Sequence, residues 1–315
     1  MASVVVATAF GGPEVLTVID KPVGAPGPAE VLLSVRAAGV NPIDAKLYGG
    51  SFGSDVSRLP MRLGFEASGV VEAVGEEARG PAGPVLVGDE VIVFRTSGAY
   101  AERLLVDASS VVPKPAALTW EEAAGLMLTG VTAVHALAAT GVGRGDTLLV
   151  HAASGGVGLM TIQLARAVGA RVIGTASSRR HDVVRRFGAE PVAYGDGLTD
   201  RIRALTPAGV DAAIDAIGSD EAIDTSLALV DDRDRIATLA AFERGGRAGI
   251  KLLGGGPGAD PGEEIRDAAR LQLIRHVEDD GLRVVVSQAY PLAEVAQAHR
   301  ALLEGHTHGK LVLVP

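Results

Sequence analysis

A glycine-rich turn at residues 151–158 carries the clearest chemical signal in this sequence. It reads His-Ala-Ala-Ser-Gly-Gly-Val-Gly, which matches A-x-G-x-x-G, and it separates an apolar strand from an amphipathic helix. One glycine of such a turn lets a pyrophosphate approach the backbone, and the last lets helix and strand pack closely. The helix N-terminus offers N–H groups and a partial positive charge to the anion. We therefore expect a dinucleotide to bind Ser154, Gly155, Gly156, Val157 and Gly158; the alternative is an ordinary glycine-rich turn.

The end of the following strand indicates which nicotinamide cofactor would fit. An NAD site usually places Asp or Glu there to bind the ribose 2′-hydroxyl. Here the strand ends in Gly-Thr-Ala-Ser-Ser and two arginines follow. Hydroxyl groups and a planar guanidinium suit a 2′-phosphate, so we expect Ser177, Ser178 and Arg180 to select NADPH. Tyr194, after the next strand, would add a hydroxyl. The alternative is that the arginines only solvate the start of a helix.

The elements that would position these residues form an alternating series of strands and helices from Asp146 onward, within a domain expected over residues 118–258. Such alternation implies a doubly wound parallel sheet with helices on both faces, that is, an α/β Rossmann domain that ends near strand Ile250–Leu253. Residues 1–117 contain short apolar runs separated by Pro and Gly, which predicts a mainly-β domain. Residues 259–315 do not extend the series, so we expect them to rejoin the first domain. A helix is expected over Ala123–Ala139, after the N-cap Thr119.

Composition excludes several classes of function. The net charge is −9, and no basic tract stands out, so a nucleic acid is an unsuitable partner. The sequence has no cysteine, which excludes disulfides, thiolate metal sites and cysteine nucleophiles. Its apolar stretches are interrupted before they reach membrane-spanning length, and its N-terminus does not resemble a signal peptide. We therefore expect a cytoplasmic protein without a membrane partner.

Short motifs occur in a fixed order along nearly the whole chain. They are Val40–Asp44, Leu63–Val71, Gly88–Val91, Gly98–Glu102, Leu128–Ala133, Ser154–Gly158 and His306–Val312. In this order they resemble the quinone oxidoreductase branch of the medium-chain dehydrogenase/reductase superfamily. The resemblance implies a mainly-β, GroES-like catalytic domain with the Rossmann domain inserted. It also implies a homodimer that pairs through the edge strand of the Rossmann sheet, here Ile250–Leu253; the alternative is an edge strand protected by the charge of Lys251.

The chain departs from the zinc-dependent relatives at the positions of their ligands. Those relatives carry Cys where this chain has Asn41 and His where it has Phe65. Without these ligands, and without any cysteine, neither of the family's zinc sites can be built. Glu66 remains, but a single carboxylate does not hold catalytic zinc. We therefore expect no metal, and hydride transfer from NADPH to an acceptor that is already activated by conjugation, such as a quinone or an α,β-unsaturated carbonyl.

Three residues of one segment are the catalytic candidates. The Asn41 amide would donate to the developing oxyanion, or it would only fix the turn before Pro42. Lys46 would stabilise an oxyanion or point to solvent; relatives often carry Tyr there. Tyr48 would donate a proton or pack as an aromatic, and the proton would otherwise come from water. Asp44 is expected to be a structural hydrogen-bond acceptor and not a base.

Two further residues are expected near the nicotinamide. The resemblance places Thr129 there, with helix capping as the alternative, and Phe242 follows a Rossmann strand, with a place in the core as the alternative. The glycine-rich segment Gly254–Gly262 is expected to form a mobile flap. Two other functions stay open. One is an enoyl or enone reductase of secondary or lipid metabolism without quinone activity, and the other is a non-catalytic NADPH-binding protein.

Overall fold

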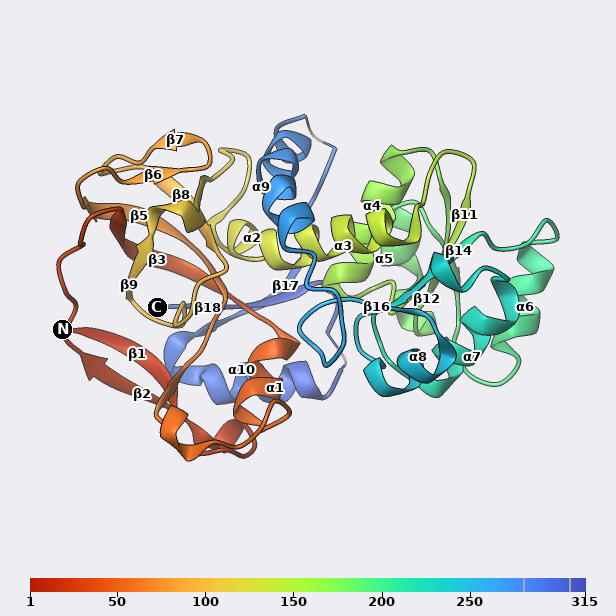
Figure 1. Ribbon diagram of the computed structural model, residues 1–315, viewed down its shortest axis with the longest axis horizontal. Coiled ribbons are helices and arrows are strands. Elements are labelled where there is room, and N and C mark those ends of the chain that lie inside the picture. Colours follow the sequence, from red (N-terminus) through yellow and green to blue (C-terminus); the bar gives the residue numbers. More distant parts are fainter. Residues whose placement is uncertain (280, 306) are drawn as a thin grey trace. The chain divides into compact units, whose positions relative to one another are not determined.

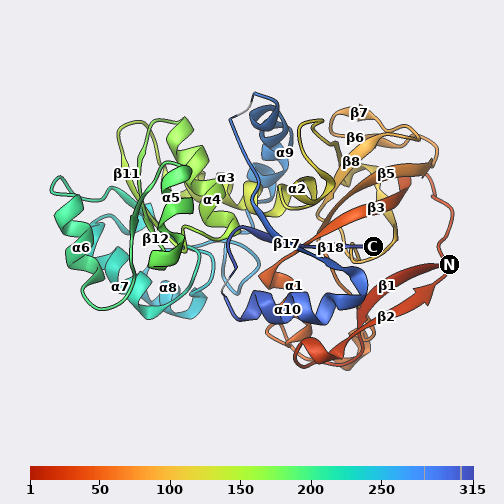
Figure 2. The same ribbon diagram turned by 180° about the vertical axis from the view of Figure 1, so that it is seen from behind.

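The computed structural model describes residues 1–279, 281–305 and 307–315, so His306 lies outside the described residues. The chain divides into two compact units. Unit 1 comprises Met1–Leu128, Leu271–Glu278 and Val284–Pro315, and unit 2 comprises Thr129–Arg270 and Asp279–Arg283. Figure 1 follows the chain through both units, and Figure 2 shows the same elements from behind.

Unit 1 is built mainly from two sheets. The larger has the order β10-β8-β5-β3-β18-β17, and β9 also pairs with β3. The smaller has the order β2-β1-β4. The strands of the larger sheet are β3 (Glu30–Val40), β5 (Glu66–Val74), β8 (Glu90–Phe94), β9 (Arg103–Asp107), β10 (Val111–Pro113), β17 (Val286–Pro291) and β18 (Lys310–Val314). Those of the smaller sheet are β1 (Ala2–Ala7), β2 (Leu16–Lys21) and β4 (Met61–Arg62), and a separate short pair is β6 (Arg79–Gly80) and β7 (Gly83–Pro84).

The C-terminal strand β18 inserts beside β3 in the larger sheet. The two strands run antiparallel, with Leu311 opposite Val40 and Leu313 opposite Ala38. The chain therefore returns to the first domain after unit 2, as the sequence predicts. This register places Lys310, the first residue of β18, next to Asn41, the residue that follows β3.

Helices at the ends of these strands complete unit 1. They are α1 (Pro42–Tyr48), α2 (Trp120–Ala124) and α10 (Val295–Leu303). A proline at the first helical position starts α1, because its fixed φ suits a helix and its missing N–H costs nothing there. The single helix expected over Ala123–Ala139 is interrupted at Gly125, so that α2 ends and α3 (Met127–Thr140) begins.

Unit 2 has the six-stranded parallel sheet that the sequence predicts. Its order is β13-β12-β11-β14-β15-β16, the 3-2-1-4-5-6 order of a Rossmann fold. The strands are β11 (Thr147–His151), β12 (Arg171–Thr175), β13 (Glu190–Val192), β14 (Ala212–Asp215), β15 (Ile236–Thr238) and β16 (Lys251–Leu252). Its other helices are α4 (Gly156–Ala167), α5 (His181–Arg186), α6 (Leu198–Leu205), α7 (Asp220–Leu229), α8 (Phe242–Ala248) and α9 (Glu263–Glu278), the last of which continues into unit 1.

The boundaries between the units differ from the expected 117/118 and 258/259. The first lies at Leu128, because α2 packs on β3 and β5 and Ser68 Oγ donates to the carbonyl of Trp120 (2.6 Å). Residues 259–270 belong to unit 2. There the ring of His135, on α3, contacts Asp260 (Nε2 to Oδ2, 3.1 Å) and accepts from Arg266 Nε (3.3 Å). Neither of these two contacts could be predicted from the composition of the sequence.

Candidate active site

The glycine-rich turn lies between β11 and α4, the context that a dinucleotide motif requires. Gly155 is the N-cap of α4 and donates its N–H to the carbonyl of Ala152 (2.9 Å). A Cβ on Gly158 would lie 2.3 Å from the Ala152 oxygen, so only glycine fits there. The first N–H groups of a helix have no partner within it, and together with the helix dipole they favour an anion. The turn therefore has the shape of a phosphate-binding site.

The residues expected at a 2′-phosphate lie together after β12. Ser177 precedes a single 3₁₀ turn, Ser178–Arg180, and its carbonyl accepts from the Arg180 N–H (2.8 Å). Tyr194 follows β13 with its side chain 60% exposed, and β13 pairs with β12 through Val192 and Thr175. All four candidates thus lie at the carboxyl ends of two neighbouring strands. His181, which sequence reasoning missed, follows directly and is half-buried.

The two residues expected near the nicotinamide both belong to unit 2. Thr129 lies in the first turn of α3 and is buried. Phe242 begins α8, and its ring packs on Gly256: a Cβ on that glycine would lie 2.5 Å from the ring carbons. The backbone before Phe242 is fixed at the carboxyl end of β15, because Thr238 Oγ1 accepts from the N–H groups of Ala240 and Ala241 (3.2 and 2.9 Å). Parallel α/β sheets bind dinucleotides at this edge.

Asn41 belongs to a buried ion-pair network in unit 1. Its Nδ2 donates to the carbonyl of Gly39 and to Glu66 Oε1, both at 3.1 Å. Its Oδ1 accepts from the ammonium of Lys310, which also donates to Glu66 Oε1 (2.8 Å) and to the carbonyl of Val40 (3.2 Å). Asn41 is only 1% exposed and Lys310 only 4%. The carboxamide therefore has its own protein partners, and donation to an acceptor oxygen would require it to release one of them.

A second buried cluster surrounds Tyr48. Its hydroxyl is hydrogen-bonded to His299 Nδ1 (3.0 Å), and its ring meets that imidazole edge-on. Burial, with the nearby Asp44 carboxylate, raises the pKa of Tyr48 to about 12. A buried phenol with a raised pKa is a poor proton donor. The structure thus matches the alternative reading, in which Tyr48 packs as an aromatic.

Asp44 is a structural acceptor, as its place in the sequence indicates. Its carboxylate accepts from the N–H groups of Gly64 (2.8 Å) and Asn41 (3.1 Å) and from the Tyr100 hydroxyl (2.9 Å). Burial raises the pKa of Asp44 to about 6, although these hydrogen bonds oppose the shift. Asp44 therefore fixes α1 against the segment before β5. Of the three catalytic candidates, only Lys46, also on α1, is partly exposed.

Lys310, Glu66 and His299 are the polar residues that sequence reasoning left without a role. The signal that could have identified the first two is a charged residue at the start of a buried strand. Lys310 opens β18 and Glu66 opens β5, and the next three residues after each of them are buried. A charge in such a position needs a buried partner. Pattern alone does not show that the two residues are partners, because they are 244 positions apart.

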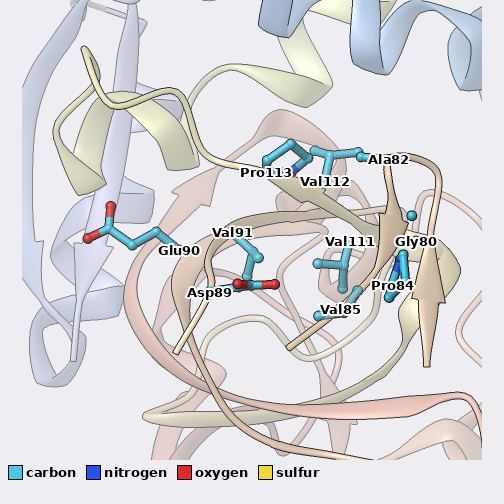
Figure 3. A pocket seen from close by; sticks show the side chains of 11 residues that line it. Gly80, Ala82, Pro84, Val85, Asp89, Glu90, Val91, Val111, Val112 and Pro113 are labelled. Atoms are coloured by element: carbon cyan, nitrogen blue, oxygen red, sulfur yellow. The ribbon is translucent and has the colours of Figure 1, made fainter. Parts of the chain in front are cut away.

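A pocket of about 200 Å³ in unit 1 lies apart from these residues. Figure 3 shows it between β7, β8 and β10, lined by Val85, Val91, Val111 and their neighbours, with Asp89 and Glu90 at one side. It contains none of the expected site residues. In the described part of the chain, no three His, Asp or Glu side chains are grouped as metal ligands, and no helix is long and apolar enough to cross a membrane.

Comparisons with known proteins identify the family. Residues 27–116 match the family model of the alcohol dehydrogenase GroES-like domain, and residues 156–253 match that of the zinc-binding dehydrogenase. A quinone oxidoreductase of Pseudomonas aeruginosa is 35% identical, and the match covers all of both chains. Two solved structures, an NAD-dependent alcohol dehydrogenase and a mycobacterial protein complexed with NADPH, are each 32% identical with TM-scores of 0.87. Their matches cover 99% of this chain and 99% and 100% of theirs. The chain therefore belongs to the medium-chain dehydrogenase/reductase family, with quinone oxidoreductases among its full-length relatives, and it is an oxidoreductase.

Proposed function

We propose that this protein transfers a hydride from NADPH to a quinone or another conjugated carbonyl without using zinc. The observation that carries the proposal lies at the end of β12, where Ser177, Ser178 and Arg180 belong to one turn. The glycine-rich turn, in which position 158 admits only glycine, follows the neighbouring strand β11. A guanidinium and two hydroxyls suit a 2′-phosphate better than a 2′-hydroxyl. The NADPH-bound mycobacterial relative supports the same choice, although the alcohol dehydrogenase relative is named as NAD-dependent.

The donors around Asn41 support a reaction without zinc. Zinc sites use thiolate, imidazole and carboxylate ligands, usually three or four of them. Here two carboxylates lie around Asn41: Glu66 is paired with an ammonium, and Asp44 accepts three hydrogen bonds from its own chain. A substrate without a Lewis acid must be activated by its own conjugation, which favours quinones and enones over simple ketones.

The chain's own residues would bind and orient the reactants. The turn at Ser154–Gly158 would hold the pyrophosphate, and Thr129 and Phe242 would contact the nicotinamide. NADPH, when bound, supplies the hydride. Tyr48 is too deeply buried to donate a proton to an acceptor, so we propose that the proton comes from water. Lys46 remains the candidate for contact with the acceptor oxygen.

The function is tested by following NADPH absorbance with a benzoquinone, a naphthoquinone, an enone and an enoyl thioester, each with and without a chelator. We expect chelator-resistant oxidation of NADPH by at least one quinone or enone, and much slower oxidation of NADH. Turnover of the enoyl thioester alone would indicate that the protein is an enoyl reductase. Tight NADPH binding without any turnover would indicate a non-catalytic binding protein, and loss of turnover with chelator would overturn the zinc-free reaction.

Arg180→Glu tests the cofactor preference. We expect the KM for NADPH to rise about ten- to a hundredfold, because a charge-assisted hydrogen bond to phosphate contributes about 1.5–3 kcal/mol. The KM for NADH should change little, since NADH has no phosphate at this position. Steady-state kinetics with both cofactors measure the ratio. Arg186→Glu, an exposed arginine at the end of α5, is the control; equal effects of the two variants on NADPH would contradict a specific role of Arg180.

We also propose a homodimer that pairs through β16. This strand is the edge of the parallel sheet, and the ammonium of its Lys251 donates to the carbonyl of Ala139 (2.6 Å) and is thus held within its own chain. The unpaired N–H and C=O groups of an edge strand can pair with those of a second copy. Light scattering after size exclusion measures the mass, and a monomer at micromolar concentration would contradict this assembly.

A further inference from the structure

Lys310 is the cation of the buried network in unit 1. Its ammonium has three hydrogens, and three oxygens lie within hydrogen-bond distance: Val40 O, Asn41 Oδ1 and Glu66 Oε1. Its side chain is 5% exposed and that of Glu66 is fully buried. The hydrogen-bonding capacity of the ammonium is therefore filled by groups that are distant in the sequence.

Three partners decide which way the Asn41 carboxamide faces. Lysine can only donate, so the group that it contacts must be the carbonyl oxygen of the side chain. The Gly39 carbonyl and Glu66 Oε1 are acceptors, so they require the amide nitrogen on their side. An apolar side chain in place of Lys310 would leave the carbonyl oxygen without its donor and Glu66 without its counter-ion. Lys310 thus holds one end of the amide directly and supports the acceptor at the other end.

Glu66 extends the same network to a second helix. Its other oxygen, Oε2, accepts from the N–H of Leu128 (2.8 Å), in the first turn of α3. The next residue along the chain is Thr129, which we propose to contact the nicotinamide. A carboxylate at a helix N-terminus is favourable, because it satisfies a free N–H and faces the positive end of the dipole. Lys310 is the counter-ion of this carboxylate, whose two oxygens accept from Asn41, before α1, and from Leu128, in α3.

Stability alone does not account for such a pair. Replacing a buried ion pair by apolar residues is often neutral or stabilising, whereas removal of one partner is costly. Close packing also surrounds the lysine: a Cβ on Gly125 would lie 3.1 Å from its side chain, and one on Gly39 would meet Glu66. Small residues thus line both members of the charge pair, and its role is not explained by stability alone.

We propose that Lys310 is a positioning residue for hydride transfer. Its ammonium binds the Asn41 carbonyl oxygen and pairs with Glu66, and that carboxylate holds both the Asn41 amide nitrogen and the turn of α3 that leads into Thr129. The inference deepens the proposed function and rests on it. Displacement of a positioned group by about 1 Å can cost about a hundredfold in rate, so the effect should appear in kcat.

Three variants test the proposal. Lys310→Met removes the charge and leaves Glu66 unpaired, which can prevent folding. Lys310→Met with Glu66→Gln removes both charges and keeps amide groups that can replace some of the hydrogen bonds. Lys114→Met is the control: Lys114 is also a lysine of unit 1 with a side chain only 6% exposed and a carboxylate partner, Glu90.

Two measurements separate positioning from folding. The first is kcat with the best acceptor, together with the Kd for NADPH. The second uses Asn41, which is the only asparagine in the sequence. A sample labelled with [¹⁵N]asparagine therefore gives one pair of side-chain amide signals, which report its surroundings directly.

We expect the double variant to fold with a Tm near that of the wild type and to bind NADPH unchanged, with kcat about a hundredfold lower. Its Asn41 amide signals should shift and broaden, and Lys114→Met should show neither effect. A double variant with wild-type kcat, or with unmoved Asn41 signals, would overturn the proposal. A wild type that oxidises no NADPH with any acceptor would instead refute the proposed function, and the amide signals would still decide whether Lys310 orients Asn41.

Discussion

Lowering the pH from about 7 to about 4 is expected to reduce the free energy of unfolding by several kcal/mol. The main cause is two buried histidines, one in each unit, whose pKa burial lowers most; burial also lowers the pKa of a third, His135. Burial lowers the pKa of His299 to about 4. Burial likewise lowers the pKa of His151 to about 4, against the opposing charge of Asp215.

The contacts of both rings suit the neutral form. His151, at the end of β11, lies 3.2 Å from the hydroxyls of Thr175 and Ser226 through its two nitrogens. His299 contacts Tyr48, and its Nε2 is buried without a hydrogen-bond partner among the described residues. A second proton on the His299 ring would bring a charge into a buried site, where desolvation disfavours it. Protonation therefore favours the unfolded chain.

The sign and size of the effect follow from the pKa values. An unfolded histidine takes up its proton near pH 6.5, whereas these two do so only near pH 4 in the folded chain. Each contributes stability that is present above pH 6.5 and lost as the pH falls toward 4, about 3 kcal/mol apiece. Asp44 acts in the opposite direction, because its folded pKa is raised to about 6 from 3.8. Its protonation stabilises the folded chain by about 3 kcal/mol over the same pH interval. The three groups together therefore still give a net loss of stability.

Urea unfolding at a series of pH values measures this dependence. His299→Gln is the informative variant, since the amide oxygen can still accept from the Tyr48 hydroxyl but the side chain does not titrate. We expect the stability of this variant to change little between about pH 6.5 and 4, because the loss at His151 and the gain at Asp44 nearly cancel. A variant that loses as much stability as the wild type would mean that folding does not lower the pKa of His299.

Gly158→Ala is expected to abolish useful NADPH binding and to destabilise unit 2. The added Cβ would lie 2.3 Å from the Ala152 oxygen and 2.7 Å from the Ala153 Cα, and both are backbone atoms that cannot rotate away. The strand and helix must then separate. Overpacking of this kind costs about 1–3 kcal/mol of stability.

The larger effect should be on the cofactor. Separation moves the N–H groups of α4 away from the pyrophosphate, and each such charge-assisted hydrogen bond contributes about 1.5–3 kcal/mol. We expect the Kd for NADPH, measured by fluorescence titration, to rise at least about a hundredfold. Gly246→Ala is the control, because the nearest atom to its added Cβ is 3.7 Å away, in a flexible leucine side chain. Wild-type affinity in Gly158→Ala would remove the turn from the proposed cofactor site.

The fold class could be predicted from local patterns because each pattern has a local cause. Alternation of strands and helices from Thr147 onward leads to parallel strands, and the structure has six of them in Rossmann order. The glycine-rich turn at Ser154–Gly158 could be located because Gly158 is required by a contact within the turn itself, with Ala152. The return of the C-terminal segment to the first domain could be expected because that segment breaks the alternation.

Element boundaries were less predictable, since tertiary contacts set them. The break between α2 and α3 at Gly125 accompanies the close approach of the Lys310 side chain, which comes from the other end of the chain. The first twelve residues after 258 joined unit 2 because Asp260 and Arg266 meet a histidine on α3. Local preferences for helix or strand do not predict such long-range contacts.

The sequence by itself determined the Rossmann topology, the glycine-rich turn between β11 and α4 and the absence of the family's cysteine ligands, because each depends on residue type and spacing within a short segment. Only the tertiary structure decided what Asn41 and Tyr48 contact. β18 pairs with β3, and this brings Lys310 to a residue 269 positions away. α10 brings His299 to Tyr48, 251 positions away. Burial and charge pairing at such separations arise from the packing of whole elements, and so they appear only when the chain is folded.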